Sequence, residues 1–334
     1  MNIAIDVMGG DHAPAEIIKG AILALKSLED IHLLLVGKED EIIPHLDEQL
    51  DRLQIIHSNE VISAEEQPVR AVRKKPHSSL VTCVRLVKEG RADACISAGN
   101  TGAYMAAGLL ELGTATGIDR PALAVLLPTV TGDPVLVLDV GANIDAKPHH
   151  LLQYAIMGDI YARNLLGIEE PRIGLLNVGL EELKGNQLVK RTFPLLKGQG
   201  FNFVGNVEAR EIPYGIVDVV VCDGFTGNVV LKLSEGMAGS LLMMFKQMLN
   251  KTMTRKLAAL LLKSGLEEYR QKIDYTHYGG APLLGLNGLC IKAHGSSNGT
   301  AIKNAIYQAR SCIKQNMAQQ IQQEFEKVSE ENGW

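Results

Sequence analysis

The sequence predicts an α/β fold in which helices cover both faces of a mostly parallel sheet. Short β-branched or Leu-rich runs recur along the 334 residues, and each run ends in a Gly- or Asn-rich turn that leads into a helical stretch. Near-continuous apolar strands that alternate with helices are typical of parallel sheets with both faces buried. Gly accounts for 33 residues and aromatic residues for only 4%, which favours tight turns over an aromatic-packed β-sandwich.

Seven runs are predicted to be strands, and each is followed by a turn. The runs are residues 3–7, 32–36, 94–97, 135–140, 172–177, 218–222 and 289–293. In parallel sheets, ligands bind beyond the carboxyl ends of the strands. Because the turns lie at those ends, we expect most of the candidate chemistry to converge on one edge of the sheet.

Helices have clear signals in three places. A proline at the start and a glycine after the end bound a helix over residues 148–166, and serines can cap a second helix over residues 79–89. Apolar residues three and four apart predict one long helix over residues 302–328. The chain has no internal repeat and no low-complexity linker, so we expect residues 1–334 to form a single α/β domain.

Charge and cysteine content exclude several classes of protein. The 33 basic and 38 acidic residues give a net charge of −5, which leaves no electrostatic footprint for nucleic acid. Five cysteines without CxxC spacing argue against a disulfide framework or a zinc ribbon. The N-terminus lacks the features of a signal peptide, and no apolar run approaches the ~18 residues that span a bilayer. We therefore expect a cytoplasmic protein that binds no nucleic acid and can still lie on a membrane surface.

Residues 236–266 form an unusual basic, Met-rich segment. They contain no Asp or Glu, and five of the ten Met of the chain fall within residues 237–253. Apolar residues at helical spacing predict an amphipathic helix that ends at Gly265, and hence a protruding helical hairpin inserted over residues 236–275.

Two interpretations of this hairpin stay open. Residues 236–249 are typical of a helix in the core or in a dimer interface, with a solvated basic face. Residues 251–266 are typical of an exposed apolar tip, in which Leu257, Leu260 and Leu261 contact a membrane.

The Gly- and Asn-rich turns are the main candidate site. A turn with successive free backbone N–H groups before a helix is a ready site for an anion, and Asn adds a neutral donor. Two of the turns, residues 99–102 and 224–228, share Gly, Thr, Gly and Asn. The candidate ligands of a phosphate or another oxyanion are Gly9, Gly10, Asp11, Gly99, Asn100, Thr101, Gly102, Asn143, Asn177, Gly179, Asn186, Gly224, Thr226, Gly227, Ser296 and Ser297.

Fingerprints of other enzyme classes are absent or incomplete. The sequence has neither GxGxxG after a strand nor GxxxxGK[ST], which disfavours a dinucleotide dehydrogenase or a nucleotide hydrolase. Residues 295–299 match the GxSxG nucleophile elbow of a hydrolase, with Ser297 as the nucleophile. In that fold the His follows the Ser, whereas no His follows His294 here. We therefore expect Ser296 and Ser297 to cap a helix or to bind an anion.

Charged and polar side chains near the turns are the candidate catalytic groups. Lys184 and Lys232 can clamp an oxyanion as point charges, and the alternative for each is an ordinary surface lysine. Aspartates at the strand ends can cap helices, bind Mg²⁺ or orient a base; they are Asp6, Asp11, Asp139 and Asp223. The catalytic candidates are Lys184, Asn228, His294, His12 and Asp223.

A basic cluster precedes Pro76 and stands apart from the turns. It consists of Arg70, Arg73, Lys74 and Lys75. Four cations in six residues can dock an acidic partner, and a solvated helix face is the other interpretation.

Seven segments that follow one another along the chain carry a family resemblance. They read IDVMGGDHAP from residue 5, SAGNTGA from 97, LDVGAN from 138, NVG from 177 with KGN from 184, DGFTGN from 223, YGGAPLLG from 278 and HGSS from 294. Together they resemble the bacterial phosphate acyltransferases, the acyl-[acyl-carrier-protein]:phosphate acyltransferases of phospholipid synthesis.

The resemblance implies both a fold and an activity. The implied fold is a three-layer α/β/α unit similar to isocitrate/isopropylmalate dehydrogenases and phosphotransacetylase, present as a homodimer, whose single domain is catalytic. The implied reaction moves a long acyl chain from acyl-carrier protein to inorganic phosphate. We expect no cofactor and no metal ligands among the site residues, and the metal dependence of the reaction stays open. The acyl-phosphate would then feed a membrane-bound glycerol-3-phosphate acyltransferase, which places the protein peripherally at the membrane.

Roles for individual residues follow from this resemblance as hypotheses. The 99–102 and 224–228 turns would hold phosphate or the carbonyl oxygen, and Lys184 would offset the developing charge. His294 or His12 would protonate the leaving thiol, and the Arg70–Lys75 cluster would dock the acidic carrier protein. Two other classes stay open: an oxidoreductase on the same fold, and a non-catalytic scaffold for membrane lipid synthesis.

Overall fold

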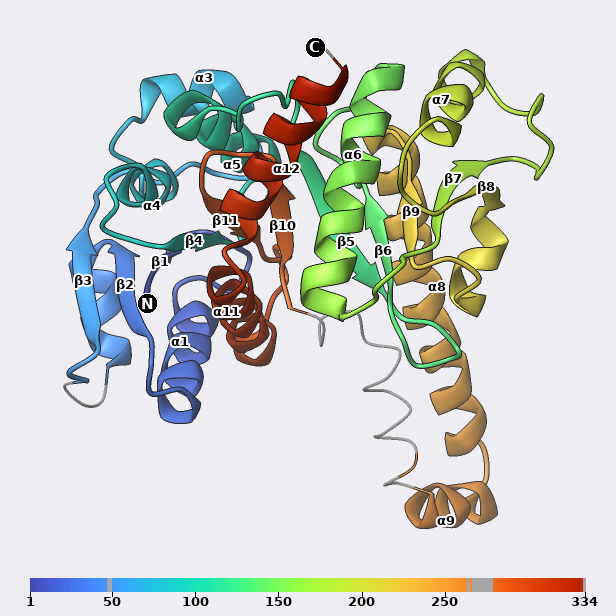
Figure 1. The fold of residues 1–334 in the computed structure, drawn as a ribbon. Helices are drawn as coiled ribbons and strands as arrows, with labels where there is room; N and C mark the ends of the chain where they lie inside the picture. Colours follow the sequence, from blue (N-terminus) through green and yellow to red (C-terminus); the bar gives the residue numbers. More distant parts are fainter. Residues whose placement is uncertain (47–49, 263–264, 266–278, 333–334) are drawn as a thin grey trace.

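The computed structural model describes residues 1–46, 50–262, 265 and 279–332. In these residues eleven strands form one sheet in the order β3-β2-β1-β4-β11-β10-β5-β6-β9-β7-β8 (Figure 1). The strands are β1 (Asn2–Asp6), β2 (His32–Gly37), β3 (Leu53–His57), β4 (Ala94–Ser97), β5 (Ala122–Leu127), β6 (Val135–Leu138), β7 (Ile173–Asn177), β8 (Phe203–Glu208), β9 (Val219–Val221), β10 (Ala281–Leu284) and β11 (Leu289–Lys292). All seven predicted runs form strands, and β3, β5, β8 and β10 are additional.

The sheet is mixed and mostly parallel, as predicted. Seven neighbouring pairs are parallel and three are antiparallel. The antiparallel pairs β11–β10, β10–β5 and β5–β6 separate two parallel blocks, so the blocks run in opposite directions. The carboxyl ends of the two blocks therefore do not lie along a single edge, which corrects the prediction that most of the candidate chemistry converges on one edge of the sheet. Turns of both blocks nevertheless reach one cavity.

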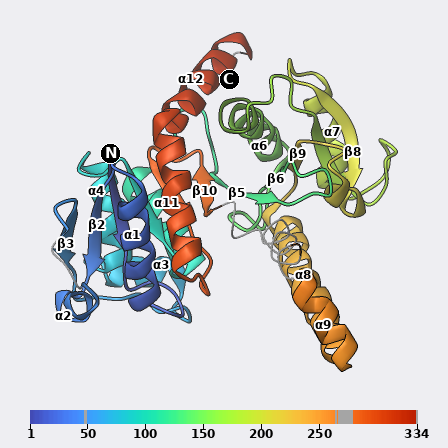
Figure 2. The same ribbon diagram turned by 90° about the horizontal axis from the view of Figure 1, so that it is seen from below.

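Helices cover both faces of the sheet (Figure 1, Figure 2). One face carries α1 (Ala15–Ser27), α6 (Pro148–Tyr161), α7 (Gln187–Lys197), α11 (Gly299–Lys314) and α12 (Met317–Asn332). The other face carries α3 (Pro68–Lys74), α4 (Ser79–Lys88) and α5 (Thr101–Ala107). Alternate residues of a strand enter the two cores: Ile3 and Ile5 of β1 pack in the first, and Ala4 packs in the second. Burial of apolar surface on both faces thus holds three layers together.

Short helical segments complete the fold. They are α2 (Glu39–Ile42), η1 (Ile43–His45), η2 (Gly108–Leu112), η3 (Ala162–Leu166) and η4 (Ala209–Tyr214). The helix predicted over residues 148–166 is present as α6 and η3, and Gly167 ends it in a left-handed conformation. The helix predicted over residues 79–89 is α4, in which the Ser78 hydroxyl accepts a hydrogen bond from the Val81 N–H.

The prediction of one long C-terminal helix over residues 302–328 is wrong in one respect, since the structure has two helices there. The chain breaks between α11 and α12, where Asn316 adopts a φ of 48°. Asn tolerates this left-handed conformation better than most residues, so it ends one helix and starts the next. The apolar stripe continues across the break because Cys312 and Met317 both pack in the same core.

The Met-rich segment lies on a long helix that leaves the body of the protein. α8 (Gly224–Asn250) is continuous, and α9 (Met253–Leu261) folds across its far end (Figure 1, Figure 2). Only Gly224 and Gly227 of α8 are buried, so the interpretation that residues 236–249 form a core helix is wrong for the single chain. Residues 263–264 and 266–278 lie outside the described residues, and with them most of the second arm of the predicted hairpin over 236–275.

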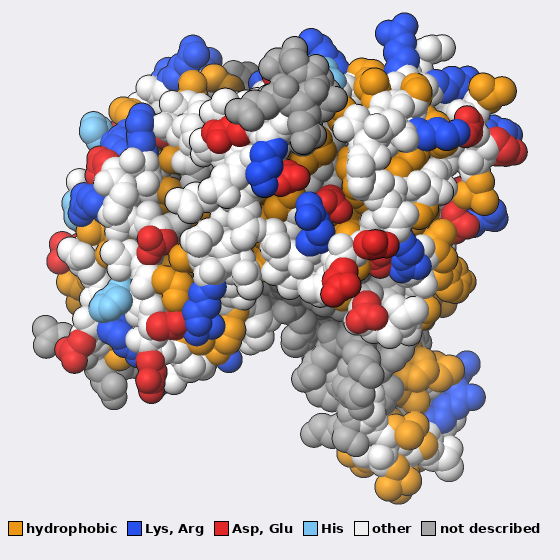
Figure 3. Space-filling view, in the orientation of Figure 1, with side chains coloured by type: hydrophobic (Ala, Val, Ile, Leu, Met, Phe, Trp, Pro, Cys, Tyr) orange, Lys and Arg blue, Asp and Glu red, His pale blue; other side chains and the backbone are white. Residues whose placement is uncertain are grey.

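The protruding segment presents apolar and basic side chains together (Figure 3). Leu257, Leu260 and Leu261 of α9 are all exposed, the last at 84%. Within the described residues, none of the helices is both long enough and apolar enough to cross a bilayer. All five cysteines are buried and free, in agreement with the prediction that the chain has no disulfide framework.

Candidate functional site

A cavity of about 710 Å³ lies between the two parallel blocks of the sheet. Turns after β1, β4 and β11 form its polar floor, and they include Gly10, Asp11, Gly99, Asn100, Thr101, Gly102, His294 and Ser297. β5 forms an apolar wall with Leu123, Val125 and Leu126, and α8 contributes Leu231 together with the charged Lys232 and Glu235. Lys232, a predicted clamp for an oxyanion, thus lines the cavity. Gly141 and Asn228 from the second block also line the cavity. A polar floor next to an apolar wall suits a ligand with one charged and one apolar part.

Beneath the floor, the ends of β1 and β4 are joined by a buried hydrogen bond. The Ser97 hydroxyl donates to the Asp6 carboxylate at 2.6 Å and accepts from the Gly99 N–H at 3.0 Å. Burial raises the pKa of Asp6, and its second oxygen, Oδ1, has no hydrogen-bond partner. Gly9 is required here, since a Cβ at this position would lie 2.5 Å from Asp6 Oδ2 and 2.7 Å from the Gly99 nitrogen. These hydrogen bonds thus hold the glycine turn after β1 and the glycine turn after β4 in contact with each other.

Lys292 at the end of β11 is a cavity residue that the sequence analysis above does not include. Its side chain is buried, lines the cavity and donates a hydrogen bond to the Ala293 carbonyl. Burial lowers the pKa of Lys292 to about 8, while the carboxylates of Asp6 and Asp11 act in the opposite direction. The signal in the sequence is a lysine that ends an otherwise apolar run, LCIK, directly before the turn.

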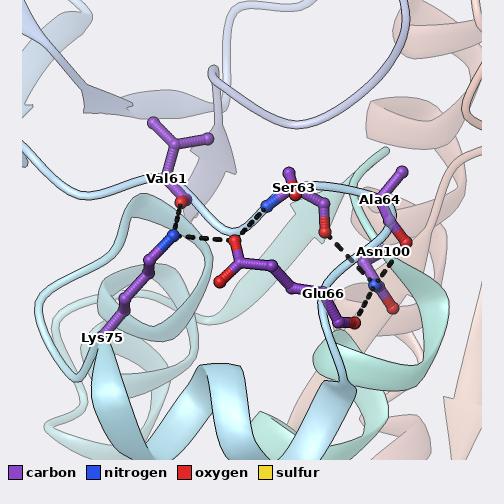
Figure 4. Close-up of polar contacts among 6 residues, drawn as sticks. All are labelled: Val61, Ser63, Ala64, Glu66, Lys75 and Asn100. Atoms are coloured by element: carbon purple, nitrogen blue, oxygen red, sulfur yellow. Dashed lines mark hydrogen bonds and ion pairs between the residues drawn. The ribbon is translucent and has the colours of Figure 1, made fainter.

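Asn100 uses its side chain to hold the loop at residues 63–66 (Figure 4). Its Oδ1 accepts from the Ala103 N–H at 3.0 Å, which caps α5. Its Nδ2 donates to the carbonyls of Ser63, Ala64 and Glu66, the nearest at 2.9 Å. The side chain therefore caps α5 and holds the neighbouring loop in place, so its donor and its acceptor are both engaged within the protein.

Asp139 plays the corresponding role in the second block. Its carboxylate accepts hydrogen bonds from the backbone N–H groups of Leu123, Gly141, Ala142 and Asn143, at 2.7 to 3.1 Å. The predicted ligand Asn143 turns inward, and its Nδ2 donates to the Pro121 carbonyl at 2.6 Å and to Asp139 at 3.1 Å. This loop positions Gly141 on the cavity wall and receives the first turn of α8.

The predicted residues at the start of α8 fall into two groups, those that shape the helix start and the one that reaches the cavity. Asp223 caps the helix, since its carboxylate accepts from the Thr226 N–H at 2.9 Å and from the Thr226 hydroxyl at 2.7 Å. Asn228 lies one turn later and lines the cavity. Gly224 and Gly227 are buried against the Asp139 loop, where a Cβ at Gly227 would lie 1.9 Å from the Asp139 carbonyl oxygen. Asp223, Thr226 and the two glycines therefore shape the helix start, and Asn228 reaches the cavity.

The turn after β11 places His294 and Ser297 at the cavity. His294 Nδ1 lies 2.8 Å from the Ser296 hydroxyl and accepts from the Ser296 N–H at 3.2 Å. Ser297 is 5% exposed and lines the cavity. Of the two roles predicted for Ser296 and Ser297, helix capping is wrong, because Asn298 caps α11 by accepting from the Ala301 N–H at 3.0 Å. Binding of an anion stays a prediction.

His12 lies next to this turn but does not line the cavity. The chain around it is tied to the turn, since the Asp11 N–H donates to the Gly295 carbonyl at 2.8 Å. His12 itself is exposed, and its carbonyl accepts from the Glu16 N–H in the first turn of α1.

The predicted residues after β7 form a separate group outside the cavity. Asn177 donates to the Lys184 carbonyl at 3.2 Å and accepts from the Val178 N–H at 2.8 Å. Asn186 caps α7 through the Val189 N–H at 3.0 Å. The Lys184 ammonium is more than half exposed and lies 4.0 Å from Glu181. The structure thus does not bring Lys184, or the neighbouring Gly179, to the cavity of the single chain.

The four residues of the basic cluster lie on α3 and directly after it, and they differ in exposure. Arg70, Arg73 and Lys74 are exposed and line a hollow next to the loop that borders the cavity. Lys75 instead turns toward that loop, and its ammonium donates to the Val61 carbonyl at 2.8 Å and to Glu66 at 2.7 Å (Figure 4). The Lys75 ion pair also lowers the pKa of Glu66. Three of the four predicted docking residues are therefore available, and Lys75 fixes the loop.

One group of side chains has ligands that a metal ion could use. Asp119, His149 and His150 bring one ligand atom each within 4.8 Å of one another. His150 Nδ1, however, accepts a hydrogen bond from the Lys147 N–H at 3.1 Å. The proton of the neutral ring then lies on Nε2, which leaves that nitrogen without a lone pair for a metal.

Comparisons with known proteins agree with this architecture. The family model described as "Fatty acid synthesis protein" matches residues 1–320. The chain is 54% identical over 325 residues to the phosphate acyltransferase of Bacillus subtilis strain 168, covering 97% of this chain and 98% of that protein. It is also 54% identical over 328 residues to the phosphate acyltransferase of Desulfitobacterium hafniense strain DSM 10664 / DCB-2, covering 97% and 98%.

Solved structures with the same fold are more distant in sequence. A phosphotransacetylase from Streptococcus pyogenes has a TM-score of 0.62 at 17% identity and covers 94% of each chain. A branched-chain phosphotransacylase from Enterococcus faecalis V583 has a TM-score of 0.57 at 14% identity and covers 93% of this chain and 98% of that one. These likenesses confirm the predicted phosphotransacetylase-like fold, and the likeness to isocitrate/isopropylmalate dehydrogenases stays a prediction. With the family match over almost its whole length, the chain belongs to the fatty acid synthesis protein family and, within it, to the phosphate acyltransferases.

Proposed function

We propose that the chain transfers a long-chain acyl group from acyl-[acyl-carrier protein] to inorganic phosphate. The products are acyl-phosphate for phospholipid synthesis and the free carrier protein. The observation that carries the proposal is the cavity itself, which is lined by glycine turns and by the apolar side chains of β5 and Leu231 of α8. A phosphate fits the first surface, and the apolar acyl chain fits the second.

Direct attack accounts for the chemistry with the groups that are available. A phosphate oxygen attacks the thioester carbonyl carbon, a C–O bond forms, the C–S bond breaks, and the sulfur leaves as a thiolate that takes up a proton. A substantial part of inorganic phosphate is the dianion near neutral pH, and a thiol with a pKa near 8.5 is a tolerable leaving group, so little help from a base is needed. Positioning and oxyanion stabilisation remain, worth roughly 7–11 and about 2.7–4 kcal/mol in other enzymes.

Among the predicted catalytic residues, the cavity favours Asn228 and His294. Both line it, Asn228 as a neutral donor for an oxyanion and His294 as a carrier of the proton to the thiolate. Lys184 and His12 lie outside the cavity of the single chain, so this mechanism gives them no contact with the reacting atoms.

The exposed helices suggest how the acyl group is delivered and removed. In this proposal the apolar and basic residues of α8 and α9 bind an anionic membrane surface peripherally, where acyl-phosphate passes to a membrane-bound glycerol-3-phosphate acyltransferase. Exposed Leu241 and Phe245, nearer the body, contact a second copy of the chain in a homodimer. Arg70, Arg73 and Lys74 dock the acidic carrier protein beside the cavity mouth.

The test is to identify the product. Purified protein is incubated with palmitoyl-[acyl-carrier protein] and phosphate, and the acyl product is trapped with hydroxylamine. Phosphate-dependent formation of the hydroxamate supports the proposal, and its absence with folded protein contradicts it. A titration with NAD and NADP tests the alternative hypothesis that the protein is an oxidoreductase. Saturable nicotinamide binding without acyl transfer would favour that class.

A further inference from the structure

Lys292 is a buried cation whose hydrogen-bonding capacity is mostly unused. Its side chain is 7% exposed, and an ammonium ion carries three N–H donors. In the part of the chain that the structure describes, its ammonium has one hydrogen-bond acceptor, the Ala293 carbonyl, and forms no ion pair. A buried charge without a partner is costly, so such a group in a cavity wall requires a ligand or another function.

The sheet register places Lys292 in one row with the buried Asp6, with Ser97 between them. Ser97 of β4 is aligned with Asp6 of β1 on one side and with Lys292 of β11 on the other. Ser97 donates its hydroxyl proton to Asp6, so this carboxylate is bonded to the serine and not to the lysine. Asp6 and Asp11 still act on Lys292 electrostatically and favour its charged form.

A second donor from the same turn lies in the cavity with Lys292. Ser297 is buried to a similar degree and also lines the cavity. The turn between the two residues is fixed by the hydrogen bond from the Asp11 N–H to the Gly295 carbonyl, at 2.8 Å. An ammonium and a hydroxyl that line the same cavity can both donate hydrogen bonds to an anion with several oxygens.

We propose that Lys292 binds the inorganic phosphate that attacks the thioester, with the Ser297 hydroxyl as a second ligand. The inference rests on the proposed function and adds to it the residue that carries the compensating positive charge. It also gives that charge to a residue that lines the cavity, in place of the exposed Lys184. The competing explanation is that Lys292 only offsets the buried Asp6 charge and never contacts a substrate.

Phosphate binding and kinetics together distinguish these explanations. Lys292→Met removes the charge and keeps the length of the side chain, Lys292→Arg keeps the charge, and Lys26→Met removes an exposed lysine of α1 as the control. Inorganic phosphate should raise the Tm of the wild type, the Lys26 variant and the Lys292→Arg variant, and leave that of Lys292→Met unchanged. In steady-state assays Lys292→Met should raise the KM for phosphate by about tenfold or more and change the KM for the acyl donor by less than about twofold.

Specific results would overturn the inference. A folded Lys292→Met protein with a KM for phosphate within about twofold of the wild type contradicts it. So does a variant that loses ligand-free stability while phosphate still raises its Tm as in the wild type. If Lys292→Met does not fold, the double variant Asp6→Asn/Lys292→Met removes the uncompensated carboxylate and repeats the test. If phosphate raises the Tm of the wild type through Lys292 but no acyl transfer occurs, the proposed function fails and the phosphate site stands.

Discussion

Asp6 and Lys292, a buried carboxylate and a buried ammonium, are aligned with the same residue, Ser97 of the strand between theirs. The serine hydroxyl donates to Asp6 and accepts from the Gly99 N–H, so it links the charged row to the turn on the cavity floor. The stability of this part of the sheet and the shape of the floor therefore depend on one side chain.

Ser97→Ala should destabilise the protein by about 1–3 kcal/mol, because a buried carboxylate loses its donor and a turn N–H loses its acceptor. Denaturant unfolding measures this loss. The control is Ser27→Ala on α1, where the hydroxyl is exposed and bonds only to the Leu23 carbonyl, and where a change within about 0.5 kcal/mol is expected. Equal free energies of unfolding for the two variants would mean that the hydrogen bonds of Ser97 do not stabilise the protein.

Two glycines of α8 should respond in opposite directions to the same substitution. A Cβ at Gly227 would lie 1.9 Å from the Asp139 carbonyl oxygen, whereas a Cβ at Gly236 meets nothing within 4 Å. Gly227→Ala should cost about 3 kcal/mol or more through overpacking. Gly236→Ala should stabilise the protein by about 0.5–1 kcal/mol through helix propensity. Thermal unfolding of the pair tests the close approach of α8 to the Asp139 loop, which a tolerated Gly227→Ala would refute.

The charge of Lys292 predicts opposite pH trends for activity and stability. Burial lowers the pKa of Lys292 to about 8 from an ordinary value near 10.5, so the ammonium is lost in the folded protein as the pH rises through about 8. The KM for phosphate should rise over that range, and less so in Lys292→Arg. Between about pH 8 and 10.5 the unfolded chain binds more protons at this residue, so its contribution to the free energy of unfolding increases with pH. A KM for phosphate that stays flat up to pH 10 would contradict this assignment.

The tip of the protruding helices should decide vesicle binding. Leu261 of α9 is 84% exposed, and burying a leucine in a membrane is worth about 1.5–3 kcal/mol, so Leu261→Glu should weaken binding to anionic vesicles about tenfold or more. Leu183→Glu is the matched control, since Leu183 is 85% exposed but lies in the loop after β7. Co-sedimentation that falls equally in both variants, or in neither, would count against a membrane role for α9.

The three exposed cations of α3 should govern the affinity for the carrier protein. Arg70→Glu with Arg73→Glu should raise the KM for the acyl donor, leave the KM for phosphate unchanged, and lose its effect at high salt. Arg210→Glu, which reverses an exposed charge elsewhere, is the control. A KM for the acyl donor unaffected by the α3 reversal would show that the carrier docks somewhere else.

The strands were predictable where local sequence determines them, and the assembly of the sheet was not. A β-branched run before a glycine turn identified seven strands, but the reversal at β10 and β5 arises from pairing between residues far apart in the chain. Asn100 illustrates the limit at the site: its position in a glycine turn suggests a ligand, and only the structure shows its amide held by the loop at Ser63. Lys292 is the opposite case. A lysine at the end of a strand is typical of a surface residue, and only the structure, through the pairing of β11 with β4, shows that Lys292 lines the cavity.

The central claim is that phosphate attacks the thioester directly in the cavity, without an acyl-enzyme. The most direct measurement is a rapid-quench single turnover of enzyme in excess over palmitoyl-[acyl-carrier protein], with and without phosphate, following thiol and acyl-phosphate together. We expect no thiol in the absence of phosphate, and equal amounts of thiol and acyl-phosphate appearing at the same rate when phosphate is present. A stoichiometric burst of thiol without phosphate would contradict the claim and would direct attention to Ser297 as a nucleophile.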